Sequence, residues 1–438
     1  MKKTLLALAM VTAMTASGQR KWTLSDCINY AIENNLSLRH ARLTQQAAQE
    51  NTKQSKAELM PSLSASTNHN VGWEPFIDSE TSVGGGKIRK TYYSGSYGIN
   101  GKWTIWNGGK NTTQLRSDRL AEEQALLDVM EQENSIQEQI AQLYVQILYT
   151  NEAIAVNKQS LETSKKNEER GQQMVEVGSM SKAELAELSA QRATDEYNVV
   201  ESETNLAKYK VQLKQLLELT DNEFDIAMST ASDEQALAAI PSLASVYEQA
   251  LLTRPEVKNA ELEVKQADLQ VKIAKAGYMP TVSLSAGVGT NTSTRNANGW
   301  GEQMKTGLSA TAGVGVTVPI FDNRLTKTAV NKAKIQREQA LLEQQNERDN
   351  LYDTIEDYWL DANSNQQKFR AAVANVESEQ QSYNLLSEQF ELGLKNIVEL
   401  MTGKATLLRA QQNMLQAKYL TILCQQLLNF YQGKNMDI

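Results

Sequence analysis

The chain has 438 residues, with 44 Lys and Arg against 52 Asp and Glu, and a formal net charge of -8 at neutral pH. This acidic balance argues against nucleic-acid partners, which favour a basic surface. Only 6% of the residues are aromatic, and the apolar residues are spread thinly along long amphipathic stretches. We therefore expect an elongated protein rather than a globular one.

The first residues have the pattern of a secretory signal. Lys2 and Lys3 precede an apolar run from Leu5 to Met14, and small residues follow, with cleavage expected after Gly18. The apolar run is shorter than the roughly 20 residues that a transmembrane helix needs, and no later segment is long and apolar enough. We expect an exported chain without a transmembrane helix.

Two cysteines, Cys27 and Cys424, lie near opposite ends of the exported chain. An oxidising compartment would permit a disulfide if their Cα atoms came within about 7 Å. Two buried free thiols are the alternative that the sequence favours. Lipid attachment at Cys27 is not expected, because the preceding residues 19–21 are polar.

The chain contains an internal repeat with an offset of about 219 residues. Leu59–Ser64 and Tyr278–Ser283 share a Met-Pro-Ser/Thr core, and in each copy a charged helical stretch precedes it and an alternating strand follows. A repeat of this kind defines the structural unit. Here the unit is a helix, two strands and a long helical hairpin.

The expected elements follow this unit twice. The first repeat, 19–218, has a helix over 22–60, strands over 61–72 and 92–105, and a hairpin over 107–218. An equatorial connector occupies 219–242. The second repeat, 243–438, has a helix over 243–279, strands over 281–290 and 307–319, and a hairpin over 322–433. Asn107 and Asp322 are the expected N-caps of the long helices, and no proline interrupts either hairpin.

Apolar residues recur at heptad-like spacing in the hairpins, which predicts coiled-coil seams. One series is Ile136, Ile140, Leu143, Ile147, Thr150, Ile154 and Leu161. A second is Ala186, Ala190, Ala193, Tyr197, Val200, Thr204, Ala207 and Val211. A third is Met401, Leu408, Leu415 and Ile422.

The four expected strands alternate apolar with small polar residues, the pattern of a barrel wall between lipid and lumen. A soluble sandwich is the alternative. Trp103, Trp106, Trp300 and Phe321 lie at or near strand ends, where interfacial aromatic residues belong. The polar loops 73–91 and 291–306 should face the exterior.

Four strands cannot close a barrel, and eight would have a filled interior. Three chains would supply twelve strands and leave room for a lumen.

These features together resemble the TolC-like outer membrane efflux proteins, over about residues 22–433. The resemblance rests on the duplicated order of elements, the Met-Pro motif at each first strand and two glycine motifs, Val175–Gly178 and Phe390–Gly393. It implies a mixed α and β membrane protein of the outer membrane of a Gram-negative bacterium. Three protomers, each giving four strands, would form a 12-stranded β-barrel continuous with a long α-helical coiled-coil tunnel in the periplasm.

The two glycines, Gly178 and Gly393, each lie midway along a proline-free helical stretch, so we expect helix reversals there, with glycine in the left-handed conformation. The resemblance implies that these turns, with Val177 and Leu392, form the periplasmic tip that an adaptor protein contacts. It also implies a pore constriction near the tip. The residues expected there are Glu184, Glu187, Glu399, Lys395 and Phe390.

The match to the family's tip is partial. The family usually has Asp, Tyr and Arg where this chain has Glu184 and Glu399, Phe390 and Lys395, and a third acidic position falls on Thr402. Glu187 is the candidate substitute. With threefold symmetry each glutamate would form a ring of like charges, which favours cations.

No sequence motif supports an enzymatic function. The two histidines, His40 and His69, belong to no metalloprotease pattern, and Gly84–Lys87 lacks the spacing of a phosphate loop, so no catalytic, cofactor-binding or metal site is expected. We expect a passive outer-membrane exit duct that works with a periplasmic adaptor (membrane fusion) protein and an inner-membrane pump of the RND or ABC type. The alternatives are a duct for type I protein secretion and a coiled-coil protein that tethers envelope layers without conducting.

Overall fold

The structure, a computed structural model, describes residues 21–76, 90–220, 224–228 and 231–436. The expected signal, most of the loop 73–91 and the Gly84–Lys87 motif lie outside these residues. No helix in the described ranges has both the length and the apolar character needed to cross a membrane.

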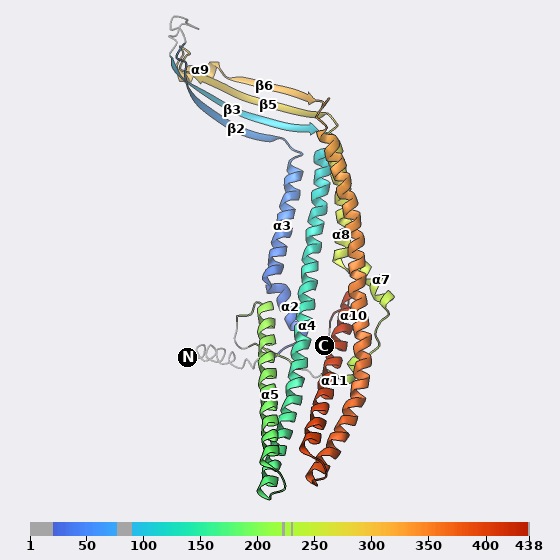
Figure 1. Cartoon of the computed structure of the whole chain (residues 1–438). Helices are drawn as coiled ribbons and strands as arrows, with labels where there is room; N and C mark the ends of the chain where they lie inside the picture. Colours follow the sequence, from blue (N-terminus) through green and yellow to red (C-terminus); the bar gives the residue numbers. More distant parts are fainter. Residues whose placement is uncertain (1–20, 77–89, 221–223, 229–230, 437–438) are drawn as a thin grey trace, which may run out of the picture. The chain divides into compact units, whose positions relative to one another are not determined.

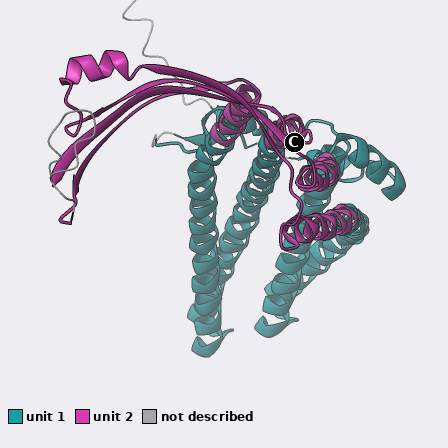
Figure 2. Cartoon of the chain, turned by 90° about the horizontal axis from the view of Figure 1, so that it is seen from above, with its two compact units in different colours: residues 1–42, 128–257, 346–438 teal, residues 43–127, 258–345 magenta. Residues whose placement is uncertain are grey.

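The chain divides into two compact units (Figure 2). Unit 1 comprises Met1–Arg42, Asp128–Val257 and Asn346–Ile438, and unit 2 comprises Leu43–Leu127 and Lys258–Gln345.

Unit 2 contains a four-stranded antiparallel sheet in the order β2-β3-β5-β6 (Figure 1). The strands are β2 (Ser62–Trp73), β3 (Thr91–Trp106), β5 (Thr281–Ser293) and β6 (Ser309–Thr317). Strands from the two halves of the chain meet where β3 pairs with β5. The outer strands β2 and β6 each pair on one side only in this sheet, so each leaves a row of backbone donors and acceptors unpaired.

The register sorts the side chains of this sheet onto two chemically different faces, because directly paired residues share a face. One row joins Ala65, Ile99, Val288 and Ala310. The next row joins Ser64, Asn100, Gly287 and Thr311 on the other face. No described residue covers the apolar face, since Leu63, Val71, Val314 and Val316 are all exposed. The sheet therefore has one uncovered apolar face and one face of small polar groups.

The helices come in pairs of equal length. The helices α4 (Lys110–Glu176) and α10 (Leu325–Glu391) have 67 residues each, and α5 (Lys182–Leu216) and α11 (Ile397–Tyr431) have 35 each. Before the strands, α2 (Leu24–Asn34) and α7 (Leu243–Thr253) have 11 residues, and α3 (Leu36–Ala57) and α8 (Pro255–Ala276) have 22. A 67-residue helix is about 100 Å long.

The two long helices start at capping side chains. Asn107 Oδ1 accepts a hydrogen bond from the Asn111 N–H at 3.2 Å, and Asp322 Oδ2 accepts one from the Thr326 N–H at 2.8 Å. Each oxygen satisfies a first-turn donor that has no partner inside the helix.

The helices expected over 22–60 and 243–279 are each divided in two, which corrects the prediction of continuous helices. Asn35 is extended, with ψ of 131°, and its Oδ1 accepts from the Ser37 N–H at 2.9 Å, so it caps α3. Arg254 is also extended and precedes Pro255, the first residue of α8. Proline disfavours a helical residue before it and suits the first position of a new helix.

Regular structure occurs both in the expected loop 291–306 and in the expected connector 219–242. In the range 291–306, β5 continues to Ser293 and α9 (Trp300–Thr306) follows. Gln303, which is buried, explains this order, because its side chain accepts from the Ser293 N–H and donates to the Ser293 and Asn298 carbonyls. The connector 219–242 contains the short strand β4 (Asp225–Ile226), paired with β1 (Lys21–Trp22), and the short helix α6 (Asp233–Ala236).

The core of unit 1 is built from the hairpin helices and the segments packed on them. The first heptad series contributes Ile136, Ile140 and Ile147, and the third contributes Ile422. Cys27 and Cys424 also lie in this core as free thiols, and burial raises the pKa of each to about 12. Such thiols stay protonated and unreactive at neutral pH.

The second series is exposed along α5, so no described residue of this chain covers it and a seam for this series stays a prediction. Tyr197 and Val200 are 65% and 57% exposed, and Val211 is also exposed. The buried face of α5 carries Leu188, Asp195, Val199 and Leu213 instead. The heptad residues of α5 form an uncovered stripe.

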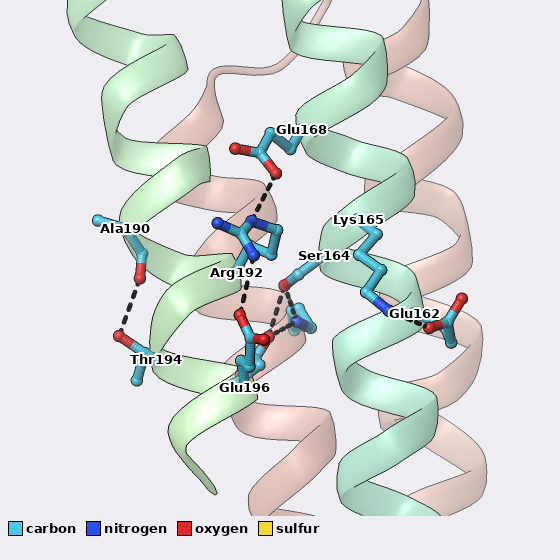
Figure 3. A network of polar contacts seen from close by, with 10 residues as sticks. Glu162, Ser164, Lys165, Glu168, Ala190, Arg192, Thr194 and Glu196 are labelled. Atoms are coloured by element: carbon cyan, nitrogen blue, oxygen red, sulfur yellow. Dashed lines mark hydrogen bonds and ion pairs between the residues drawn. The ribbon is translucent and has the colours of Figure 1, made fainter. Parts of the chain in front are cut away.

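A buried charged cluster joins both hairpins. Lys404 of α11 donates hydrogen bonds to Ser164 of α4 and Asp195 of α5, and the Ser164 hydroxyl also donates to Asp195. The Lys404 and Asp195 side chains are only 7% and 2% exposed. Burial lowers the pKa of Lys404. Beside this cluster, Arg192 forms ion pairs with Glu168 and Glu196 (Figure 3). A buried ion pair fixes which residues of two helices can face each other.

We predict that Lys404→Met destabilises unit 1 by about 3–5 kcal/mol, because it leaves the Asp195 carboxylate buried without its cation. The double variant Lys404→Met with Asp195→Leu should recover most of this loss. Hydrogen exchange of the α11 amides measures the change. Lys208→Met, which alters an exposed lysine of α5, is the control. Equal exchange in the Lys404→Met and Lys208→Met variants would contradict the prediction.

Candidate functional site: the two hairpin turns

Both hairpins reverse at a glycine with left-handed backbone. Gly178 has φ of 76° and Gly393 has φ of 71°. At the first turn the Gly178 N–H donates to the Val175 carbonyl and the Ser179 N–H to the Met174 carbonyl. The second turn repeats both bonds at Gly393 and Leu394. This is the Schellman arrangement, and it satisfies the last carbonyls of α4 and α10.

Three residues after each glycine, a capping box begins the returning helix. Ser181 and Asn396 are the N-caps, and each accepts a hydrogen bond from the N–H of the glutamate three residues later. Those glutamates, Glu184 and Glu399, accept in return from the N–H of the N-cap residue at 2.8 and 3.2 Å. The spacing of glycine, N-cap and glutamate therefore has a local structural cause.

These bonds also determine the charge at the turns. The backbone hydrogen bond from Ser181 lowers the pKa of Glu184. For Glu399 the hydrogen bond from Lys395, at 2.6 Å, lowers the pKa most, followed by the backbone bond from Asn396. Both glutamates are surface groups that remain ionised at neutral pH. A lowered carboxylate pKa means that this local stabilisation is present above pH about 4.5 and is lost as the pH falls through the folded-state value.

A small hydrophobic cluster lies between the turns. It contains Leu188 of α5, Tyr383 and Phe390 of α10, and Ile397, Leu400 and Leu407 of α11. Met174 and Met180 of the first hairpin pack against it, and Arg170 of α4 pairs with Glu391 of α10. The cluster and the ion pair hold the two turns together within unit 1. Phe390 is only 4% exposed, so in the single chain its ring packs in this cluster rather than in open space.

The tips of both turns expose apolar side chains. Val177 and Leu392, expected to contact a partner, are 79% and 74% exposed. Leu394 and Val398 of the second turn are also exposed, and the sequence reasoning did not single them out. Glu187 is exposed on α5. The Thr402 hydroxyl, at the position where the family has an acid, donates to the Val398 carbonyl at 2.7 Å.

Two features of the site were missed at the sequence level. The capping boxes had a readable signal, because Ser181 and Asn396 each stand three residues before a glutamate. The cluster of Ser164, Asp195 and Lys404 had none, since its members lie 31, 209 and 240 residues apart along the chain. In the described ranges no group of three or more His, Cys, Asp or Glu side chains could hold a metal ion.

The family model for outer membrane efflux proteins matches residues 27–218 and 246–432, which is most of the chain. The chain belongs to the outer membrane efflux protein family. The two matched segments are separated by 219–245, a range that includes the connector between the expected repeats.

Several named proteins are similar to this outer membrane efflux protein along nearly its whole length. Outer membrane efflux protein BepC of Brucella suis is 20% identical over 423 residues, covering 95% of this chain and 87% of BepC. Cation efflux system protein CusC of Escherichia coli K12 is 20% identical over 401 residues, covering 90% of this chain and 82% of CusC.

Solved structures of channels share the fold. The chain superposes on CusC with a TM-score of 0.82 at 16% identity, covering 94% of this chain and 92% of that one. The Campylobacter jejuni CmeC outer membrane channel gives a TM-score of 0.80 at 18% identity, with coverage of 95% and 87%. This family member therefore has the mixed helix-and-sheet fold of outer membrane efflux channels.

We predict that Gly178→Ala and Gly393→Ala each cost about 1–2 kcal/mol of local stability, because a residue with a Cβ is strained in the left-handed region. No atom lies within 4 Å of a Cβ added at either position, so the cost is conformational rather than steric. Hydrogen exchange at residues 172–182 and 387–397 measures it. Gly301→Ala, which also meets open space but has no positive φ, should be neutral. Unchanged exchange at the turns would contradict the prediction.

Proposed function

We propose that this protein is the outer-membrane exit duct of a tripartite efflux system, in which three copies form a closed β-barrel of twelve strands above an α-helical tunnel. The observation that carries the proposal is the sheet with its uncovered apolar face and its two unpaired edges. Lipid can cover that face, but unpaired backbone groups are costly in hydrocarbon, so the edges must pair with other strands. Pairing of β6 in one copy with β2 in the next would satisfy them.

The uncovered stripe on α5 supports an assembly of several copies. Tyr197, Val200 and Val211 recur on one side of a helix whose other side is buried in its own hairpin. Heptad residues that do not pack within the chain suit a seam with a neighbouring helix. A second copy of the chain supplies such a helix without any further component.

We also propose that the fold arose by internal duplication. The support is the equal lengths of four helix pairs and the constant offset of 215 residues that relates α4 to α10 and α5 to α11. The same offset relates Gly178 to Gly393 and Glu218 to Gly433, which end α5 and α11 with positive φ. The repeats proposed for 19–218 and 243–438 fit these spacings.

In this proposal the two turns form the periplasmic tip, and control of the duct resides there. The exposed apolar residues Val177, Leu392 and Leu394 suit contact with a periplasmic adaptor, whose own partner would be an inner-membrane pump. Glu184, Glu187 and Glu399 are the candidates for the constriction. Lys395 forms an ion pair with Glu399 and partly neutralises its charge. Phe390 has a supporting role, because it packs beneath the second turn.

Conduction separates a duct from a non-conducting tether. We predict that the purified protein, reconstituted into planar bilayers, gives stepwise conductance from the trimeric fraction, and that monomeric fractions give none. Crosslinked and size-separated samples provide the comparison. A trimer that inserts without conducting would exclude the duct, and conductance from monomers would exclude the shared barrel.

Charge at the turns should set ion selectivity. We predict that Glu184→Gln combined with Glu399→Gln lowers the cation-to-anion permeability ratio by about twofold or more, because rings of carboxylates favour cations. Glutamine preserves the capping boxes, so the turns should stay folded. Reversal potentials in a salt gradient measure the ratio.

The matched control for this pair is Glu201→Gln with Glu377→Gln, which removes two exposed carboxylates from α5 and α10 away from the turns. Because the pKa values of Glu184 and Glu399 are lowered, wild-type selectivity should also persist between pH 7 and pH 5. Equal permeability ratios in the wild type and the turn variant would remove these glutamates from the constriction.

A further inference from the structure

The ends of the strands that join the helices expose a set of large apolar and aromatic side chains. Trp106 ends β3, Tyr278 and Met279 precede β5, and Phe321 follows β6, and all of them are exposed. Trp103 lies three residues before the end of β3. Its Nε1 donates to the Leu59 carbonyl at 2.9 Å. Amphipathic aromatic rings at strand ends are typical of the boundary between hydrocarbon and water.

Immediately beyond these residues, unit 2 exposes a cluster of cations on the adjoining helix ends. We call it the basic band, and all of its members are exposed lysines or arginines. The ten residues are Lys56, Lys110, Arg116, Arg119, Lys272, Lys275, Arg324, Lys327, Lys332 and Lys334. In the part of the chain that the structure describes, none of them forms an ion pair, which distinguishes them from Lys53, paired with Glu50.

The carboxylates in the same helical turns do not neutralise the band. Seven lie within four residues of a member of the band, and four of these are engaged by other groups. Asp118 accepts from Ser55 and Gln114, Asp268 accepts from Arg337 at 2.6 Å, and Asp322 caps α10. Glu338 accepts from Arg337 at 3.0 Å, and Glu58, Glu122 and Glu123 are the remaining three. Ten cations against seven nearby carboxylates leave a local excess of positive charge in a chain whose net charge is negative.

The band lies close to the strands. Lys110, Lys275 and Lys327 lie within the first or last turn of their helices, and Arg324 immediately precedes α10. The most distant members lie within about 15 Å of the helix end at a rise of 1.5 Å per residue. The Debye length at physiological salt is about 8 Å. The cations nearest the strands therefore lie within about one Debye length of a charged layer at the aromatic boundary. The more distant cations add to the positive potential there.

We propose that the basic band binds anionic phospholipid headgroups of the membrane leaflet that adjoins the helix-bearing ends of the strands. Lysine is a compact donor for phosphate and arginine a bidentate one. A cluster of cations next to a membrane boundary is attracted to anionic lipid. The order of an apolar strand face, an aromatic boundary and then cations matches the order of hydrocarbon, interface and phosphate in a bilayer. The proposal rests on the membrane role proposed for the sheet.

The test compares lipid headgroups and matched charge variants. The full-length protein in a nonionic detergent is titrated with dioleoyl-phosphatidylglycerol or dioleoyl-phosphatidylethanolamine, and the melting temperature is followed, since a ligand of the folded state raises it. The band variant combines Lys110→Gln, Lys275→Gln, Lys327→Gln and Arg324→Gln. The control combines Lys166→Gln, Lys208→Gln, Lys368→Gln and Arg409→Gln, which removes the same residue types from exposed positions in unit 1.

We expect phosphatidylglycerol to raise the melting temperature of the wild type and the control more than phosphatidylethanolamine does. The band variant should need about tenfold more phosphatidylglycerol for half of the effect. Raising the salt from 0.1 M to 1 M, where the Debye length falls to about 3 Å, should reduce the wild-type response. An unchanged response in the band variant, an equal loss in the control, or no difference between the two lipids would overturn the proposal.

Conductance measured on the same samples in neutral-lipid bilayers separates this proposal from that of the duct. We expect the band variant to conduct as the wild type does, with the same selectivity. A band variant with altered anion permeability and an unchanged lipid response would place the cations along the conduction path, which overturns the lipid assignment. A wild type that responds to phosphatidylglycerol without conducting would refute the duct and leave the lipid site standing.

Discussion

The backbone hydrogen bonds that β2 and β6 leave unmade are the constraint on which the rest of this structure depends. A strand edge in water can bond to solvent, but an edge in hydrocarbon has no such partner. The sheet has an apolar face that suits hydrocarbon and edges that do not. Only additional strands resolve this conflict, and the chain has none left in the described ranges, because β1 and β4 pair with each other in unit 1. The proposed assembly follows from this unmet requirement.

The helical hairpins are held by two kinds of interaction, one local and one between distant segments. Each hairpin is closed by a glycine and a capping box, so the turns are determined locally by a few residues. The two hairpins are held to each other by the cluster around Phe390 and by the buried pair of Lys404 and Asp195. Local interactions therefore fix the shape of each turn, while interactions between distant segments fix how the hairpins of one chain face each other. Opening of the proposed tip would have to work against these interactions between distant segments.

Much of this arrangement could be predicted from the sequence because it depends on short-range patterns. Alternation placed the strands, proline and glycine marked the boundaries and the turns, and heptad spacing indicated the long helices. The breaks at Asn35 and Arg254 were missed because a single extended residue hardly disturbs a helical pattern. The partner of the stripe on α5 could not be predicted, since periodicity shows which residues share a face and not what covers it. The bond between Lys404 and Asp195 required the fold itself.

The uncovered stripe on α5 and the two open strand edges also bear on how such a protein can be made. A newly exported chain presents both surfaces before any other copy reaches it, and both are surfaces that promote aggregation. In the proposed assembly, the stability of the folded chain would depend on the concentration of the chain itself, as in obligate oligomers. When too few copies are made, a chain does not meet another copy. When synthesis is faster than membrane insertion, the α5 stripes and strand edges of copies outside the membrane come into contact. Supply and insertion of the chain must keep pace with each other in the cell.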